Sequence, residues 1–99
     1  TDPNYFSYLQ KCVGKPIIIR TVTFIYTGMV AEVTPLEIIL KKAAWIADTG
    51  RWTNALKTGN FEEVEPYPDD IEDGECVVML GAVVDYSPWP HKLPRDTNS

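Results

Sequence analysis

A long run of β-forming residues, from position 13 to position 46, limits this chain to a fold built mainly from strands. The run reads VGKPIIIRTVTFIYTGMVAEVTPLEIILKKAAWI and is rich in Ile, Val, Thr, Tyr and Phe, which suit a pleated, half-buried surface. It is interrupted near residues 21–23 and at Thr34-Pro35, because proline cannot donate a ladder hydrogen bond. Three strands, over about residues 16–20, 24–33 and 36–46, are therefore predicted to form an antiparallel meander.

Two shorter apolar segments near the far end, residues 75–80 and 82–86, repeat the strand pattern around Gly81. Together with the meander they predict a mostly β protein, a small five-stranded barrel. Gly28 lies inside the second strand, where glycine usually marks a bulge, a bend or a close approach of two backbones. A small barrel needs such a bend, because one long strand must serve both halves of it.

A single domain is expected to span residues 1–99, with the barrel over about residues 15–86. A short helix is predicted over residues 3–13, because Asp2-Pro3 is a start signal and apolar residues then recur at helical spacing. The proline-rich tail, residues 87–99, is expected to run extended over the surface, with Trp89 or Leu93 as an anchor.

A long variable loop, residues 47–74, separates the third and fourth predicted strands. Residues 51–57 are predicted to form one or two helical turns that Gly59 closes. Residues 61–68 alternate weakly and are interpreted as a short extended edge. The acidic residues that follow, 69–75, are typical of a solvated turn.

The composition excludes several classes of protein. A formal net charge of -5 excludes a strongly basic nucleic-acid binder at the level of the whole chain, although a local basic patch stays open. The apolar runs are shorter than the roughly 18 residues that a membrane helix needs, and no signal-peptide pattern opens the sequence, which predicts a soluble, cytoplasmic protein without a membrane partner. Two cysteines, Cys12 and Cys76, are too few for a disulfide scaffold and are expected to be buried thiols.

No pattern in the sequence indicates catalysis, a metal site or a cofactor. His91 is the one histidine, and no nearby serine or cysteine forms a nucleophile motif, so it is expected to be an exposed tail residue. The acidic run from Glu62 to Glu75 concentrates hard metal ligands but lacks the spacing of a calcium loop. We therefore expect a protein that is not an enzyme and that needs no cofactor.

Arg51, Trp52 and Lys57 form the best local candidate for a nucleic-acid contact, because stacking and phosphate pairing need aromatic and basic residues together. Lys41-Lys42 is a second candidate, for which a charged solvent-facing surface is the alternative. The tryptophans also have an alternative role, in which they pack the barrel ends and anchor the loop and tail.

The order of these elements resembles the Sm/LSm family of ring-forming small β-barrels. The first stretch of resemblance is YLQKCVGKPIIIRTVTFIYTGMVAEVTPLEIILKKA, with Gly14-Lys15 before the first strand and Tyr26-Thr27-Gly28 within the second. The second stretch is CVVMLGAVVDYSPW, with Gly81 at the turn. The acidic loop and the WPHKLP tail resemble a divergent branch, such as the phage-associated Sm-like proteins, which implies the cytoplasm of a bacterial or phage-infected host cell.

The resemblance implies that single-stranded RNA is bound at an inner rim, by the residues corresponding to Leu36, Glu37, Leu80 and Gly81. This sequence departs from the family there. The family loop usually reads Asp, any residue, an apolar residue, Asn, but here Glu37 replaces the amide, and a carboxylate cannot donate to a base. The family usually has an arginine or lysine before the glycine of the second stretch, and here Leu80 stands in that position before Gly81.

Assembly into a ring has a physical basis as well as the resemblance. A partly open barrel leaves two edge strands unpaired, and apolar edges aggregate unless they are covered. The resemblance implies that the fourth strand of one subunit pairs with the fifth of the next, in a homo-oligomeric ring of about five to seven copies. The candidate interface residues are Cys76, Val77, Val78, Met79, Leu80, Ala82, Val83, Val84, Asp85 and Tyr86.

Two functions follow from this interpretation. The first is a non-catalytic Sm-like ring that binds RNA, as a riboregulator with altered base-contact residues. The second is a structural or protein-interaction ring that does not bind RNA, which the acidic charge favours.

Overall fold

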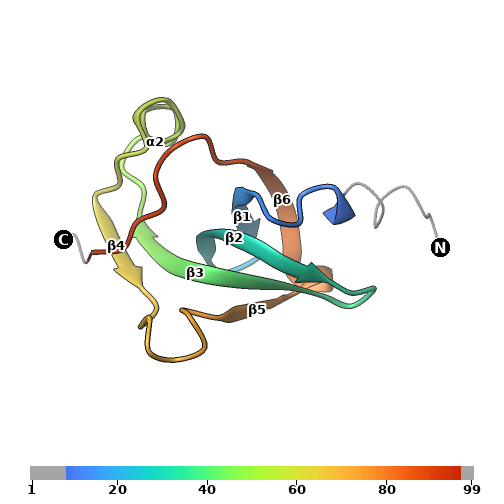
Figure 1. Cartoon of the computed structure of the whole chain (residues 1–99). Helices are drawn as coiled ribbons and strands as arrows, with labels where there is room; N and C mark the ends of the chain where they lie inside the picture. The colour runs from blue at the N-terminus through green and yellow to red at the C-terminus, as the bar shows by residue number, and fades with distance from the viewer. Residues whose placement is uncertain (1–8, 97–99) are drawn as a thin grey trace.

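The fold is a strongly bent antiparallel sheet with a short helix beside it (Figure 1). The computed structural model describes residues 9–96 of the chain. Their elements are β1 (Pro16–Thr21), β2 (Ile25–Val33), β3 (Glu37–Asp48), α2 (Trp52–Thr58), β4 (Glu63–Pro66), β5 (Cys76–Met79), the 3₁₀ turn η1 (Leu80–Ala82) and β6 (Val83–Pro88). The mostly β fold predicted from the sequence is confirmed.

Strand β3 is the longest strand and pairs with three others. The order across the sheet is β4-β3-β2-β1-β6, and β5 also pairs with β3. Strand β4 pairs with residues 44–48 of β3, whereas β5 pairs with residues 37–40. Strands β4 and β5 therefore follow the same edge of β3, one after the other, with residues 67–75 between them.

The sheet has six strands rather than the five predicted. The weak extended edge predicted over residues 61–68 is a paired strand, β4. It ends at Pro66, although the N–H of Tyr67 still donates to the carbonyl of Ala43 at 2.9 Å. Pro68, which has no backbone donor, then precedes the acidic turn.

Strands β2 and β3 bend together at Gly28. Their pairing shifts register between Thr27 and Met29. A Cβ atom on Gly28 would lie 3.0 Å from the Cβ of Leu40, so only glycine lets the two strands approach this closely. In β3, Lys42 adopts a left-handed conformation with φ of 52°. The bend predicted at Gly28 is confirmed.

The bend directs two backbone donors of β3 toward the acidic turn. The N–H of Lys42 donates to the carbonyl of Asp73 at 2.8 Å, and the N–H of Ala43 donates to the carbonyl of Gly74 at 2.9 Å. These bonds satisfy the backbone where strand pairing is interrupted, and they attach the turn between β4 and β5 to the middle of β3.

Two hydrophobic clusters lie on opposite faces of the sheet. The alternation along β1 separates them, since Ile17 and Ile19 enter one cluster and Ile18 the other. The inner cluster, enclosed by the bend, has the buried residues Leu9, Ile17, Ile19, Val30, Val33, Ile38, Leu40, Ala43, Cys76, Val78 and Leu80. The outer cluster has the buried residues Ile18, Ala44, Ile46, Ala55, Phe61, Val64 and Trp89.

The outer cluster is covered by α2 and by the C-terminal tail, which crosses from β6 to a position beside β4 (Figure 1). The helix predicted before Gly59 is confirmed, and Gly59 closes it with a φ of 79°. The tail was predicted to begin at residue 87, but β6 continues to Pro88. Proline is tolerated there because the last position of the strand needs no backbone donor toward β1.

The predicted helix over residues 3–13 lies mostly outside the described residues. Within them, Leu9 and Gln10 are helical, and Leu9 is fully buried in the inner cluster. No helix within residues 9–96 is long and apolar enough to cross a membrane.

Replacement of Gly28 by alanine is expected to lower the free energy of unfolding by about 1–3 kcal/mol, because the added methyl meets the side chain of Leu40 and the backbone of Ala43. Gly81→Ala is the matched control. No atom lies within 4 Å of a Cβ built there, so its effect is expected to stay within about 0.5 kcal/mol. Urea unfolding of both variants measures the difference, and equal stabilities would contradict the close approach of β2 and β3.

Candidate nucleic-acid and subunit interfaces

The β2–β3 loop and the turn η1 lie side by side. The N–H of Leu80 donates to the carbonyl of Leu36 at 2.8 Å. The loop is closed by Thr34, whose N–H donates to the carbonyl of Glu37 at 2.9 Å. The structure thus brings the four predicted rim residues together, Gly81 included. Their side chains differ, because Leu36 is 70% exposed whereas Leu80 is buried in the inner cluster.

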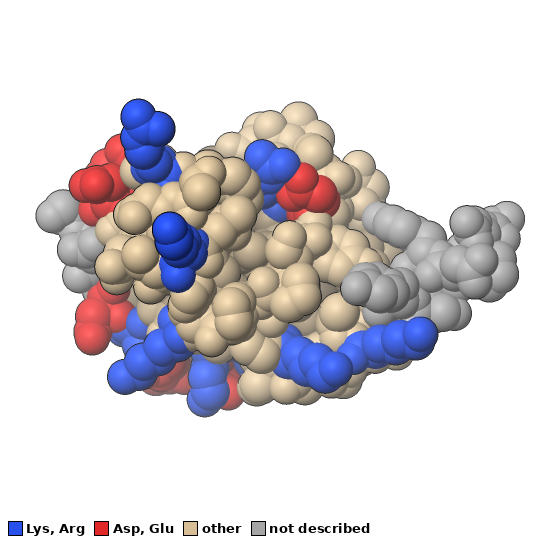
Figure 2. Space-filling view, turned by 90° about the horizontal axis from the view of Figure 1, so that it is seen from above, with Lys and Arg blue, Asp and Glu red and all other residues tan. Residues whose placement is uncertain are grey.

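The predicted rim has no positive charge, because residues 34–37 and 80–82 include no lysine or arginine. Four of the nine Lys and Arg residues are paired with carboxylates, as Arg20–Asp85, Lys41–Glu75, Lys42–Asp73 and Arg95–Asp69. The other five form no ion pair within residues 9–96, and they are Lys11, Lys15, Arg51, Lys57 and Lys92. Figure 2 shows a face on which basic and acidic side chains lie mostly around the margin of a largely uncharged centre.

The predicted group on α2 is only partly available to a ligand. Arg51 and Lys57 are exposed, but Trp52 is half-buried among the residues that pack against the outer cluster. The guanidinium of Arg20 lies 4.9 Å from the centre of the Trp52 ring and so occupies one of its faces. Because α2 follows the end of β3 and the rim precedes its start, the structure places these two predicted groups at opposite ends of that strand.

The predicted subunit-interface residues fall into three groups. Cys76, Val78 and Leu80 are buried in the inner cluster, so their side chains are not available to a second subunit. Ala82, Val83 and Tyr86 are half-buried, and Asp85 is exposed but bound to Arg20. The exposed apolar side chains are Val77, Met79 and Val84.

Each of the two strands that carry these residues has one unpaired edge. In the part of the chain that the structure describes, β5 pairs with β3 alone and β6 pairs with β1 alone. Val77 on β5 and Val84 on β6 are 45% and 62% exposed. Two free, partly apolar edges therefore remain, as the sequence predicted.

The acidic turn contains no group of side chains arranged to hold a metal ion within residues 9–96. Its carboxylates instead hold the loop in place. Asp73 and Glu75 pair with Lys42 and Lys41 of β3. Asp69 pairs with Arg95, which also donates to the carbonyl of Tyr67 at 3.1 Å. The turn therefore binds the tail as well as β3, which the sequence did not indicate.

The tail is packed more closely than predicted. Trp89 is 2% exposed and stacks on Phe61, with ring centres 5.3 Å apart. His91 is half-buried rather than exposed, and its Nε2 lies 2.7 Å from the carbonyl of Leu56 at the end of α2, a distance at which a protonated Nε2 donates. Its ring also meets Trp89 edge-on at 4.9 Å. The role predicted for Trp89 as an anchor is consistent with this packing.

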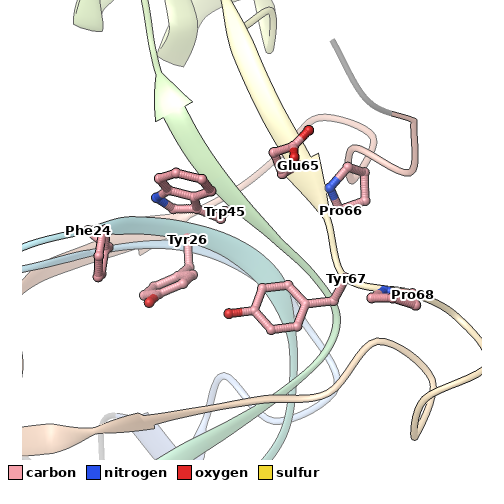
Figure 3. Close-up of a pocket in the computed structure, with 7 residues that line it drawn as sticks. All are labelled: Phe24, Tyr26, Trp45, Glu65, Pro66, Tyr67 and Pro68. Carbon is pink, nitrogen blue, oxygen red and sulfur yellow. The ribbon is translucent and has the colours of Figure 1, made fainter. Parts of the chain in front are cut away.

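An aromatic groove opens where β2, β3 and β4 meet, and the sequence analysis did not identify it. Its volume is about 420 Å³, and it is lined by Phe24, Tyr26, Trp45, Glu65, Pro66, Tyr67 and Pro68. Figure 3 shows the hydroxyl group of Tyr67 directed toward the Tyr26 side chain, with Trp45 beside Tyr26. Burial raises the pKa of Tyr67, and the neighbouring thiol of Cys76 raises it further, so this hydroxyl stays neutral.

The hydrogen bonds from Arg20 lower the pKa of the Asp85 carboxyl. The pair therefore stabilises the fold above the ordinary pKa of aspartate, about 3.9, and the contribution is lost as the pH falls through the lowered value. We expect Asp85→Asn to lose a small amount of stability at neutral pH and to match the wild-type chain in strong acid. Urea unfolding across this pH range measures it, with Asp70→Asn as the control. If the difference in free energy of unfolding between the wild-type chain and Asp85→Asn did not become smaller in acid, the stabilising role of the Arg20–Asp85 pair would be contradicted.

Comparisons with known proteins agree with the fold. No protein-family model matches the chain, and no curated protein matches it either. Among solved structures, it is similar to a heptameric archaeal Sm protein that was described for its implications for the eukaryotic snRNP core. The match has a TM-score of 0.58 and 21% sequence identity, and it covers 85% of this chain and 98% of the archaeal one. The bent sheet, with β5 and β6 each unpaired along one edge, is therefore the Sm-like fold.

Proposed function

We propose that this chain is a non-catalytic subunit of a homo-oligomeric ring, in which β5 of one copy pairs with β6 of the next. The observation that carries the proposal is the pair of unpaired strand edges, each with exposed apolar side chains. An exposed edge presents free backbone donors and acceptors that favour pairing with another strand. Since β5 and β6 are different edges of one molecule, the contact is head-to-tail and repeats from copy to copy.

A closed ring is favoured over an open filament by the similar archaeal protein, which is a heptamer. Head-to-tail contacts close when the rotation between neighbours divides a full turn, and the bend of the sheet sets that rotation. The intramolecular pairing of β5 with β3 and of β6 with β1 holds both edges in position before assembly. We propose a ring of about five to seven copies on this basis.

Val84→Asp and Val77→Asp are each expected to convert the ring to a monomer. Both side chains are exposed in the single chain, and a carboxylate there would lose its hydration when the ring contact covers it. Val22→Asp is the control, since Val22 is 76% exposed in the β1–β2 turn and lies on neither edge. Light scattering coupled to gel filtration measures the mass, and circular dichroism checks that each variant is folded. A wild-type chain that stays monomeric at every concentration would refute the ring.

RNA binding is a second candidate function, and one arrangement favours it. Arg51 and Lys57 are exposed at the two ends of α2 and form no ion pair within residues 9–96. In a ring, each copy would repeat this pair, so weak phosphate contacts would add along a strand. The rim carries the carboxylate of Glu37 and no positive charge, which supports contacts to the RNA backbone at α2 over base recognition at Leu36 and Gly81.

Titration with U-rich and A-rich oligonucleotides at several salt concentrations tests this function. We expect weak binding with little sequence preference, and a double-logarithmic salt slope of roughly 0.7 for each phosphate contact. The double variant Arg51→Gln with Lys57→Gln should lower both affinity and slope, whereas Lys92→Gln, which changes an exposed tail residue, should lower them less. A ring that binds neither oligonucleotide would instead support a purely structural or protein-interaction function.

A further inference from the structure

The chain binds one of its own arginines in a way that shows what a guanidinium site requires here. Arg20 lies over the ring of Trp52, and its Nε donates to Oδ1 of Asp85 at 2.8 Å while a second nitrogen pairs with Oδ2. A tryptophan face and a carboxylate that accepts two hydrogen bonds match the flat, charged and forked shape of the guanidinium.

The aromatic groove contains the same two components without a cation. Trp45 and Glu65 lie directly opposite each other on β3 and β4, so their side chains are on one face of the sheet and within reach of a common ligand. Trp45 is 37% exposed, and Glu65 is exposed and forms no ion pair within residues 9–96. Figure 3 shows both residues at the same end of the groove.

The remaining lining of the groove also suits a flat organic cation. Phe24 meets Trp45 edge-on, with ring centres 5.8 Å apart and planes at 88°, and Tyr26 and Tyr67 add two further aromatic rings. Rings at steep angles to one another form walls rather than a flat platform. The electron-rich faces of such walls attract cations.

The charges on the groove decide between a cation and a nucleic acid. Glu65 is the one charged residue among the seven that line the groove, and no lysine or arginine is among them. A nucleotide could stack on Trp45, but its phosphate would lie near the Glu65 carboxylate, and no lysine or arginine lines the groove to neutralise it. A guanidinium gains both from the ring and from the carboxylate.

We propose that the aromatic groove binds an arginine side chain of a partner polypeptide, with the guanidinium against Trp45 and paired with Glu65. The groove, at about 420 Å³, exceeds what one guanidinium fills, so residues beside the arginine also fit. Pro66 and Pro68 give that part of the wall no backbone donors, which suits apolar neighbours of the arginine. The site is made within one copy of the chain and does not depend on the proposed ring.

The test follows the indole N–H signals of the full-length chain by NMR during titration with a short peptide that contains one arginine flanked by glycine and serine. The matched peptide has citrulline, which keeps the planar shape and lacks the charge. We expect the Trp45 signal to move saturably with the arginine peptide in the millimolar range and to stay in place with citrulline. The Trp89 signal is an internal reference, because its Nε1 faces the carbonyl of Lys92 at the buried tail.

Variants connect the response to the groove. Glu65→Gln is expected to weaken binding of the arginine peptide about fivefold, the effect of losing one exposed ion pair. Glu32→Gln changes the net charge equally on an exposed position of β2 outside the groove, and it should bind like the wild-type chain. Trp45→Leu should remove binding, and an unchanged Trp89 signal would show that this variant is folded.

Equal responses to the arginine and citrulline peptides would overturn the proposal, as would equal loss of binding in Glu65→Gln and Glu32→Gln. A Trp45 signal that moves with a single-stranded oligonucleotide and not with the peptide would assign the groove to nucleic acid instead, and would also overturn it. Light scattering on the same samples reports the ring separately, so failure of one proposal is distinguishable from failure of the other.

Discussion

The close approach of two backbones at Gly28 is the contact on which the rest of the structure depends. Because the glycine has no side chain, β2 reaches the Cβ of Leu40, and both strands turn at the same point. One sheet can then enclose its own core instead of needing a second layer. The turn interrupts pairing at Lys42, and the carbonyl of Asp73 in the acidic turn takes up the backbone donor that is freed. The acidic turn is thus attached to the barrel wall at Asp73 and Gly74, while residues 69–73 stay exposed to solvent as predicted.

The bend also determines which surfaces are closed and which are open. Inside it, the apolar side chains of alternate residues on β1, β2, β3 and β5 meet in the inner cluster. Outside it, the helix and the tail cover the opposite face. Near β4, Tyr67 packs against the inner cluster and lines a groove together with Trp45. Both the free strand edges and this groove are therefore consequences of a small barrel that does not close completely.

Much of this fold could be predicted from local patterns in the sequence. β-Branched residues broken by Thr34-Pro35 predicted the meander, Gly28 predicted the bend, and the spacing before Gly59 predicted α2. The split between β4 and β5 was harder to foresee, because it depends on hydrogen bonds between β3 and a turn about thirty residues later, and such pairing leaves no periodic signal.

The candidate sites were less predictable, for reasons of register. The sequence predicted that every residue of the segment around Val77 contributes to the subunit interface. Side chains alternate along a strand, however, and this alternation buries Cys76 and Val78. Trp45 and Glu65 are twenty positions apart in sequence, and only the pairing of β3 with β4 places them together. Arg20 and Asp85 meet in the same way, through the pairing of β1 with β6. Contacts between side chains on separate strands can be recognised only when the pairing and register of those strands are known.

The packing of Trp89 against Phe61 has a practical consequence for where this domain ends. The last strand finishes at Pro88, yet the indole beyond it fills the outer face, and Arg95 is bonded to the backbone at Tyr67. A fragment that ended at the last strand would expose the apolar outer cluster, and it would aggregate or be cleaved by proteases. The minimal autonomous unit for expression or limited proteolysis therefore extends through Arg95, seven residues past the last strand.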